Sequence, residues 1–217
     1  PVLVADVLAL ADAFGAAQFT LVGHDWGGAI AWATALKAQD RVTRLIQCNA
    51  AHPYVFQKTL IFDADQRAAS QYISEFRDRD IEGEVAAKGM DWFFDDRFAK
   101  ISAAQIAAED RATYLDEWAQ PGALTGMLNW YRASPMQVPA LDAPAISTPF
   151  LDAPFPKLAM PVLVIWGLND EALLPCQLDG LDTHIPNLTI IRVADAGHFI
   201  PWEQPQAVTQ AMRNWLA

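Results

Sequence analysis

The stretch FTLVGHDWGG, residues 19–28, decides the fold of this chain. Its mostly apolar first four residues predict a short strand, and the Ala-rich residues 29–38 that follow carry apolar side chains at helical spacing. The glycines between strand and helix permit a sharp turn because they lack side-chain bulk. Asp25 stands at the apex of this turn, beside the free N–H groups and the positive dipole end of the helix, which favour its ionised form. The stretch therefore predicts a strand, a tight turn that presents a carboxylate, and a helix.

The composition limits the class of protein. Of 217 residues, 53% are hydrophobic and 19% are charged, which is ample material for one globular core. The net charge of −11 disfavours nucleic acid and anionic membranes as partners, so we expect a small, neutral, hydrophobic substrate. Two cysteines are too few for a disulfide framework, and no apolar run approaches the roughly 20 residues of a membrane helix. We expect a soluble, cytoplasmic protein, for which a homo-oligomer is left open.

Strands and helices alternate on both sides of the opening stretch. Residues 2–14 predict a helix that Gly15 ends, and residues 42–48 predict a second, mostly apolar strand of the kind found in parallel sheets. Strand, helix and strand in this order predict a right-handed crossover. The alternation returns late in the chain, with strands predicted over 162–166 and 188–193 and helices over 173–184 and 205–216.

The middle of the chain breaks this alternation. Residues 63–134 contain no convincing strand, and helices are predicted over 67–77, 101–118 and 122–132. The Pro-dense residues 135–161 cannot form a continuous helix and are expected to run over the surface as turns and extended chain. We therefore predict an α/β core formed by residues 1–62 and 151–217, and a helical cap with a Pro-rich return segment formed by residues 63–150.

Three polar residues each stand shortly after a predicted strand: Asp25, Asp170 and His198. Because loops that leave the carboxyl ends of parallel strands meet at one edge of the sheet, we expect these side chains to converge there. Glu171 competes with Asp170 for the acidic role, and the alternative role of Asp170 is to cap the following helix.

These three residues suggest a reaction. A histidine oriented by a carboxylate acts as a general base. At the position where many hydrolases carry serine in Gly-x-Ser-x-Gly, this chain carries Asp25, which needs no base at neutral pH and can attack an electrophilic carbon to form an ester. His198, paired with Asp170, would activate the water that cleaves this ester. The backbone N–H of Trp26 is expected to donate to the oxyanion of that second step.

The stretches GHDWGG at 23–28, GLND at 167–170 and GHF at 197–199, in this order, resemble the α/β-hydrolase fold in its branch with an aspartate nucleophile. That branch contains epoxide hydrolases and haloalkane or haloacid dehalogenases, and the resemblance covers essentially the whole chain. It implies a parallel sheet with flanking helices and a helical cap over the active site. No metal-ligand cluster, Gly-rich phosphate loop or basic stripe stands out, so we expect no metal and no cofactor.

Two cap tyrosines favour epoxide hydrolases within this branch. The stretch NWYR at 129–132 resembles the cap motif whose tyrosine, here Tyr131, binds the epoxide oxygen, and Tyr72 resembles the second cap tyrosine. Opening an epoxide leaves an alkoxide, which two phenols of pKa about 10 can polarise and protonate, whereas a halide leaving group needs no proton. The alternative for both tyrosines, and especially for Tyr72, is a packing role.

The chain departs from the family pattern at its start. The family has further strands ahead of the first helix found here, and a His-Gly-x-Pro loop that supplies a second oxyanion N–H. We expect an N-terminal portion with these features to exist outside residues 1–217. The alternative is a truncated chain whose strand 19–22 has lost its neighbour and exposes an apolar sheet edge.

The sequence therefore predicts a hydrolase that opens an epoxide to a vicinal diol through an ester on Asp25. The first alternative is a dehalogenase, in which the indole N–H of Trp26 and that of a cap tryptophan would bind the halide. The second is a non-catalytic hydrolase shell that holds a hydrophobic ligand.

Overall fold

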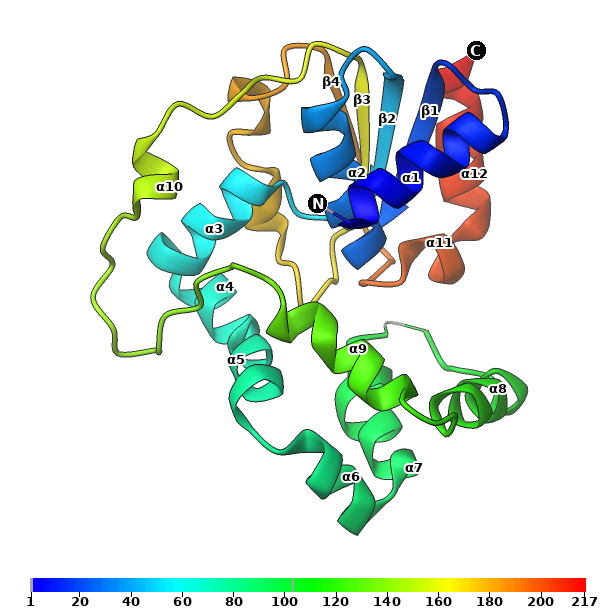
Figure 1. Ribbon diagram of the computed structural model, residues 1–217, viewed down its shortest axis with the longest axis vertical. Helices are drawn as coiled ribbons and strands as arrows, with labels where there is room; N and C mark the ends of the chain where they lie inside the picture. Colours follow the sequence, from blue (N-terminus) through cyan, green and yellow to red (C-terminus); the bar gives the residue numbers. More distant parts are fainter. Residues whose placement is uncertain (1, 103) are drawn as a thin grey trace.

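The computed structural model describes residues 2–102 and 104–217. These residues form a four-stranded parallel sheet in the order β1, β2, β3, β4 (Figure 1). The prediction of a parallel α/β sheet is confirmed, and β1 and β3 run slightly longer than expected. The strands are β1 Phe19–His24, β2 Val42–Cys48, β3 Val162–Gly167 and β4 Leu188–Val193.

Helices cover both faces of the sheet. Leu45 of β2 belongs to the apolar cluster that contains Trp32 of helix α2, Asp25–Lys37. Its neighbour Ile46 belongs to a second cluster, which contains Val208 of helix α12, Pro205–Leu216. This division follows from the pleat, which turns successive side chains to opposite faces. Every residue of β3 is buried, as expected for a strand covered on both sides.

Strand β1 forms one edge of the sheet. Among the described residues it pairs with β2 alone, and its Val22 is exposed. Helix α1, Val2–Ala13, packs beside α2 on this side of the molecule (Figure 1).

A layer of helices follows β2 and lies next to the sheet (Figure 1). Its own apolar core contains Phe76, Ile81, Val85, Phe93 and Leu128. As predicted, the described residues between 63 and 134 include no strand. The helices are α3 Pro53–Phe62, α4 Ala64–Ala69, α5 Gln71–Asp78, α6 Ile81–Lys88, α7 Met90–Phe93, the π-helix η1 Phe94–Phe98, the 3-10 helix η2 Ala99–Ile101, α8 Ala108–Trp118 and α9 Ala123–Arg132.

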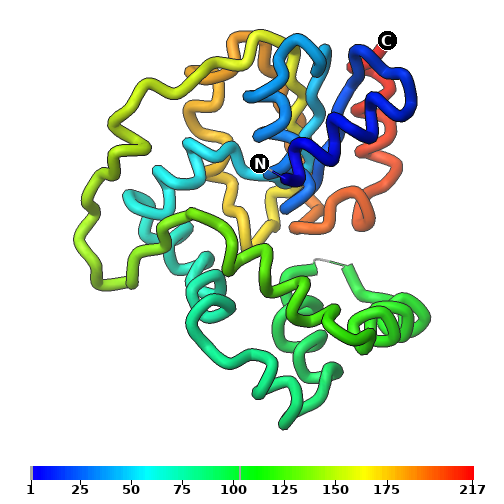
Figure 2. Tube along the Cα trace, in the orientation of Figure 1, coloured from blue at the N-terminus to red at the C-terminus, as the bar shows by residue number. Residues whose placement is uncertain are grey.

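The return segment, residues 135–161, runs from α9 along the outside of the molecule back to β3 (Figure 2). It is extended chain and turns with one short helix, α10, Pro149–Asp152. The predicted character of this segment is confirmed, and the division into core and cap at residues 62/63 and 150/151 stays a prediction.

The helix predicted over 173–184 is wrong. This segment forms two 3-10 helices, η3 Pro175–Leu178 and η4 Leu181–Thr183. Pro175 disfavours a helical conformation of the residue before it, and Leu174 is extended. Gly180 has φ +74° and separates the two short helices. The last helices are α11 Ile200–Glu203 and α12.

Two predicted cap helices also have different bounds. The helix predicted over 67–77 is interrupted at Ser70, whose buried hydroxyl accepts a hydrogen bond from Gln66. The helix predicted over 101–118 begins only at Ala108. Before it, the Ser102 hydroxyl bonds the backbone of Ala104, and such local bonds compete with helix formation. Residue 103 of that prediction lies outside the described residues.

None of the helices formed by the described residues has both the length and the apolar character needed to cross a bilayer.

Candidate active site

Asp25 is the first residue of α2 and lies at the strained turn where β1 passes directly into this helix. Its φ is +49°, in the left-handed region that residues with side chains rarely adopt. The turn closes because Gly23 and Gly28 touch: a Cβ on Gly23 would lie 2.5 Å from the Cα of Gly28. The Asp25 side chain projects from this turn with 40% of its surface exposed. The sequence pattern and the backbone thus agree in presenting a carboxylate.

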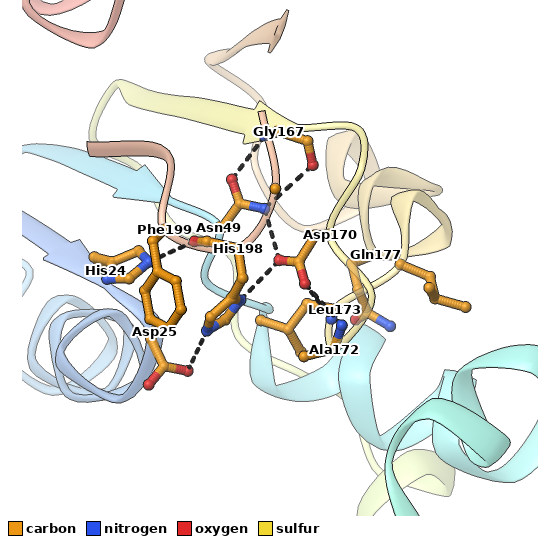
Figure 3. A network of polar contacts seen from close by, with 12 residues as sticks. His24, Asp25, Asn49, Gly167, Asp170, Ala172, Leu173, Gln177, His198 and Phe199 are labelled. Atoms are coloured by element: carbon orange, nitrogen blue, oxygen red, sulfur yellow. Dashed lines mark hydrogen bonds and ion pairs between the residues drawn. The ribbon is translucent and has the colours of Figure 1, made fainter. Parts of the chain in front are cut away.

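His198 joins Asp25 to Asp170 (Figure 3). The Nδ1 atom of His198 lies 2.8 Å from Oδ2 of Asp170, and its Nε2 atom lies 3.3 Å from Oδ1 of Asp25. Because a carboxylate oxygen accepts, the Nδ1–H of His198 is the donor to Asp170. The structure therefore brings together three side chains that are far apart in sequence. Glu171, the competing acid, is exposed to solvent.

Asn49 orients Asp170 and was not identified from the sequence. Its Nδ2 donates to Oδ2 of Asp170 at 2.7 Å, while Oδ1 of Asp170 accepts from the N–H groups of Ala172 and Leu173 at 2.8 Å each. Asn49 follows β2 directly and adopts φ +36°, which asparagine tolerates better than most residues. Its place at the carboxyl end of a strand was the signal that could have identified it.

The imidazole of His198 lies between two carboxylates. Burial lowers the pKa of His198, but hydrogen bonds to Asp170 and Asp25 and their charges raise it by more, to about 10. Burial raises the pKa of Asp25, yet the hydrogen bond and charge of His198, together with the backbone N–H of Trp26, hold it below its usual value. The resting site at neutral pH therefore contains an ionised Asp25 and a protonated His198.

His24, directly before Asp25, holds the loop of His198. Its Nε2 atom lies 2.7 Å from the backbone carbonyl oxygen of His198 (Figure 3), which can only accept, so Nε2 of His24 carries a proton. Burial and the charge of His198 lower the pKa of His24. A neutral His24 thus ties the turn of Asp25 to the loop after β4.

The predicted cap tyrosines lie side by side, and one of them contacts Trp26. The rings of Tyr72 on α5 and Tyr131 on α9 have centroids 5.7 Å apart, and Tyr131 meets Trp26 edge to face at 5.3 Å. Burial, followed by the charge of Asp25, raises the pKa of Tyr131, and a hydrogen bond with the Trp26 side chain opposes this shift. Burial, followed by Tyr131 and by the charges of Asp25 and Asp170, raises the pKa of Tyr72. Both phenols therefore remain protonated donors at neutral pH.

A cavity of about 420 Å³ opens beside these residues. Its wall includes Asp25, Trp26 and Tyr72, and is completed by apolar side chains of α3 and the return segment, such as Phe56 and Met136. Pockets for small organic ligands have this size and apolar character. The cavity is suited to an apolar molecule that brings one reactive group to Asp25.

The described residues contain no group of three or more His, Cys, Asp or Glu side chains placed to hold a metal ion. The two cysteines are free: Cys48 is buried, and burial raises its pKa to about 12.

Comparison with known proteins identifies the family to which this chain belongs. The sequence profile of the alpha/beta hydrolase fold family matches residues 1–205. A Bacillus subtilis protein of the AB hydrolase superfamily is 33% identical over 217 residues, which cover 97% of this chain and 70% of that protein. Epoxide hydrolase 4 of Homo sapiens is 28% identical over 235 residues, which cover 99% of this chain and 58% of that protein.

Solved structures of epoxide hydrolases are also similar to this chain. A structure of epoxide hydrolases of the alpha/beta hydrolases superfamily from metagenomes of hot environments has 46% identity and a TM-score of 0.90, covering 99% of this chain and 72% of that one. A variant of a Bacillus megaterium epoxide hydrolase, complexed with its product (R)-3-[1]naphthyloxy-propane-1,2-diol, has 28% identity and a TM-score of 0.82, covering 98% and 74%. The chain spans between 58% and 74% of the length of these relatives.

Proposed function

Since the chain belongs to the alpha/beta hydrolase fold family, we propose that it opens an epoxide to a vicinal diol through a covalent ester on Asp25. The observation that carries this proposal is the arrangement around one carboxylate. Asp25 meets the His198–Asp170 pair at 3.3 Å and shares its cavity wall with Tyr72, whose neighbour is Tyr131. Relatives and solved structures named epoxide hydrolases support the same reaction.

In the first step, an oxygen of Asp25 attacks an epoxide carbon and the C–O bond of the ring breaks. The electron pair of that bond goes to the epoxide oxygen, which takes a proton from the tyrosine pair, Tyr72 and Tyr131. An alkoxide is a much stronger base than a phenolate, so the transfer is favourable although burial raises the pKa of both tyrosines. The products of this step are an ester and a phenolate.

The ester changes the state of His198. Esterification removes the negative charge of Asp25, which is one cause of the raised pKa of His198. The pKa of His198 therefore falls, and its proton can restore the phenol. His198, now neutral and oriented by Asp170, becomes a base beside the carbonyl carbon of the Asp25 ester.

In the second step, water loses a proton to Nε2 of His198 and its oxygen adds to that carbonyl carbon. In this proposal the backbone N–H of Trp26, the residue after Asp25, stabilises the oxyanion. The ester C–O bond breaks and the departing oxygen takes the proton from His198. The new carboxyl group then gives its own proton to His198, which restores the resting pair.

The cavity supports a neutral, largely apolar epoxide as the substrate. Its wall is mostly hydrocarbon, so a charged substrate would lose hydration without gaining ionic partners other than Asp25.

Two free cysteines, without a disulfide framework, support a cytoplasmic location as part of the same proposal.

A dehalogenase is the second candidate, and the position of one pair of rings favours it. The indoles of Trp26 and Trp130 have centroids 5.6 Å apart, so the two tryptophans that a dehalogenase would use are neighbours. The tyrosine pair supports epoxide opening instead, because an alkoxide leaving group needs a proton donor and a halide does not.

A panel of aryl and alkyl epoxides and haloalkanes, with diol and halide measured in parallel, tests the proposal. We expect diol without halide; halide without diol would establish the dehalogenase, and neither product would favour the ligand-binding shell. His198→Gln should trap the substrate's mass on the peptide that contains Asp25. Consumption of epoxide with an unmodified peptide would refute the covalent step.

Tyr131→Phe should lower the rate of epoxide opening about 100-fold or more, because a positioned acid contributes roughly that factor. Any halide displacement should change little. Tyr114→Phe is the matched control, since Tyr114 lies on α8 and is 38% exposed. Equal losses on epoxides and halides for Tyr131→Phe would assign that residue to packing.

A further inference from the structure

We propose that Glu203 is a positioning residue for His198, and that it acts on the hydrolysis of the ester rather than on its formation. This inference rests on the proposed function. Glu203 is the last residue of the short helix α11, which begins two residues after His198. It was not identified from the sequence, because it lies outside every strand-end loop.

The carboxylate of Glu203 reaches back to the backbone on both sides of His198. Its Oε2 accepts a hydrogen bond from the N–H of Gly197, and its Oε1 accepts one from the N–H of Phe199 at 3.3 Å. Among the described residues, no other acceptor is found for these two N–H groups. One side chain therefore satisfies both donors that flank the proposed base.

The remaining contacts of His198 hold other parts of the residue. Asp170 holds the ring at Nδ1, and His24 holds the backbone carbonyl at 2.7 Å. His24 also restrains the peptide plane after His198, because that plane contains both the His198 carbonyl and the N–H of Phe199. Glu203 bonds this plane and the Ala196–Gly197 plane through one side chain, so it fixes the two planes that flank the loop of His198 relative to each other and with them the direction in which the imidazole leaves the backbone.

The direction of the imidazole matters for one step. In ester formation the nucleophile is an already ionised Asp25 and the proton comes from the tyrosines. In ester hydrolysis Nε2 of His198 must hold a water against the carbonyl carbon of Asp25. Catalytic geometry is sensitive to displacements of about 1 Å, which can cost on the order of 100-fold in rate. Loosening His198 should therefore slow the second step selectively.

Glu203→Gln tests this inference because the amide keeps the size of the side chain but offers one acceptor oxygen. Its NH₂ group would face the second N–H, a contact between two donors. In single-turnover experiments with an epoxide that wild type accepts, we expect esterification within about twofold of wild type. Hydrolysis should be at least tenfold slower, so that the ester on Asp25 accumulates.

Glu171→Gln is the matched control, because it makes the same chemical change beside Asp170 on an exposed side chain. It should leave both steps unchanged. Equal slowing of both steps in Glu203→Gln, or hydrolysis at the wild-type rate, would overturn the inference. If Glu203→Gln does not fold, the same rates are measured in Glu203→Asp, which keeps the charge but is too short to reach both N–H groups. Ester hydrolysis at the wild-type rate in Glu203→Asp would also overturn the inference.

A second measurement separates this inference from the proposed function. If the wild-type protein forms no ester with any epoxide, the proposed function is refuted. The position of His198 can then still be compared between variants by NMR. The proton on Nδ1 of His198, bonded to Asp170, gives a proton resonance. Its chemical shift should differ from wild type in Glu203→Gln and equal that of wild type in Glu171→Gln. An unchanged resonance in Glu203→Gln would refute the positioning role.

Discussion

At the scale of single residues, the backbone of Asp25 carries the main strain of the site. A non-glycine residue at φ +49° costs about 1–2 kcal/mol, and the neighbouring contacts must hold it there. Gly28 is central to this, because a Cβ at that position would lie 2.1 Å from the Cβ of Ala50 and 2.7 Å from Oε1 of Gln47. The turn therefore depends on a close approach that only glycine allows.

Gly28→Ala should lower the free energy of unfolding by about 1–3 kcal/mol, the usual cost of overpacking a buried site. It should also lower activity, since Asp25 must move. Gly27→Ala is the control: a Cβ there meets nothing within 4 Å, and alanine favours a helix over glycine by up to about 1 kcal/mol. Urea denaturation of both variants provides the measurement, and equal stabilities would contradict this account of the turn.

The residues that the sequence identified and those that it missed differ in kind. Asp25, Asp170 and His198 could be predicted because each follows a strand in a short, readable loop. Asn49 and Glu203 do not contact the cavity; they act by bonding Asp170 and the backbone around His198. Nothing local distinguishes Glu203 from ordinary polar residues, and for Asn49 the one local signal is its place directly after β2.

At the scale of elements, one arginine joins the two helices that carry the tyrosines. Arg77 of α5 donates to the carbonyl oxygens of Tyr131, Met136 and Ser134 at 2.9, 2.7 and 3.0 Å. These carbonyls lie at and after the end of α9, where a helix has no internal donors for them. Arg77 thus fixes the end of α9, and with it Tyr131, against the helix that carries Tyr72.

Arg77→Met should destabilise the protein by roughly 2–4 kcal/mol. This is less than the sum of three hydrogen bonds from a charged donor, at about 1.5–3 kcal/mol each, because the three carbonyls are only partly buried and can bind water in the variant. In the folded variant, epoxide opening should slow while hydrolysis of the ester stays near wild type. Arg79→Met is the control, since Arg79 is 47% exposed and such surface ion pairs contribute about 1 kcal/mol or less. Thermal unfolding and single-turnover rates test both points, and similar losses in the two variants would contradict the role of Arg77.

The elements were predicted with uneven success for a physical reason. Strands surrounded by helices have long apolar runs, and all of the described strands were predicted. The helix expected over 173–184 was wrong because Pro175 and Gly180 outweigh its apolar periodicity. The break at Ser70 depends on its contact with Gln66, whose side chain also reaches the carbonyl of Ala172 after β3, a residue remote in sequence.

At the scale of the whole molecule, charge at the site should make stability depend on pH. The pKa of His198 is about 10 in the folded protein and about 6.5 in the unfolded chain. The stabilisation of the folded protein by protonated His198 is fully present below about pH 6.5 and is lost as pH rises toward 10. The free energy of unfolding of wild type minus that of His198→Gln should therefore decrease by a few kcal/mol over this range.

His52 provides a control, because its contribution to the free energy of unfolding should change with pH in the opposite direction. Burial, followed by His184, lowers the pKa of His52 to about 3, so the unfolded chain binds a proton there that the folded protein does not. The difference between wild type and His52→Phe should be constant above about pH 6.5 and decrease as pH falls toward 3. Denaturation curves at a series of pH values provide both differences; a difference for His198→Gln that does not change with pH would disprove the raised pKa.

By itself the sequence determined the parallel sheet, the sharp turn at Asp25, the helical middle section and the three residues at the strand ends. Turn chemistry and hydrophobic periodicity are local, so they can be read without coordinates. Only the tertiary structure decided that Asp170 and not Glu171 meets His198, that Tyr72 lies beside Tyr131, and that Asn49, Arg77 and Glu203 hold these groups in place. Those relations join residues from separate elements, and their distances exist only once the chain has packed.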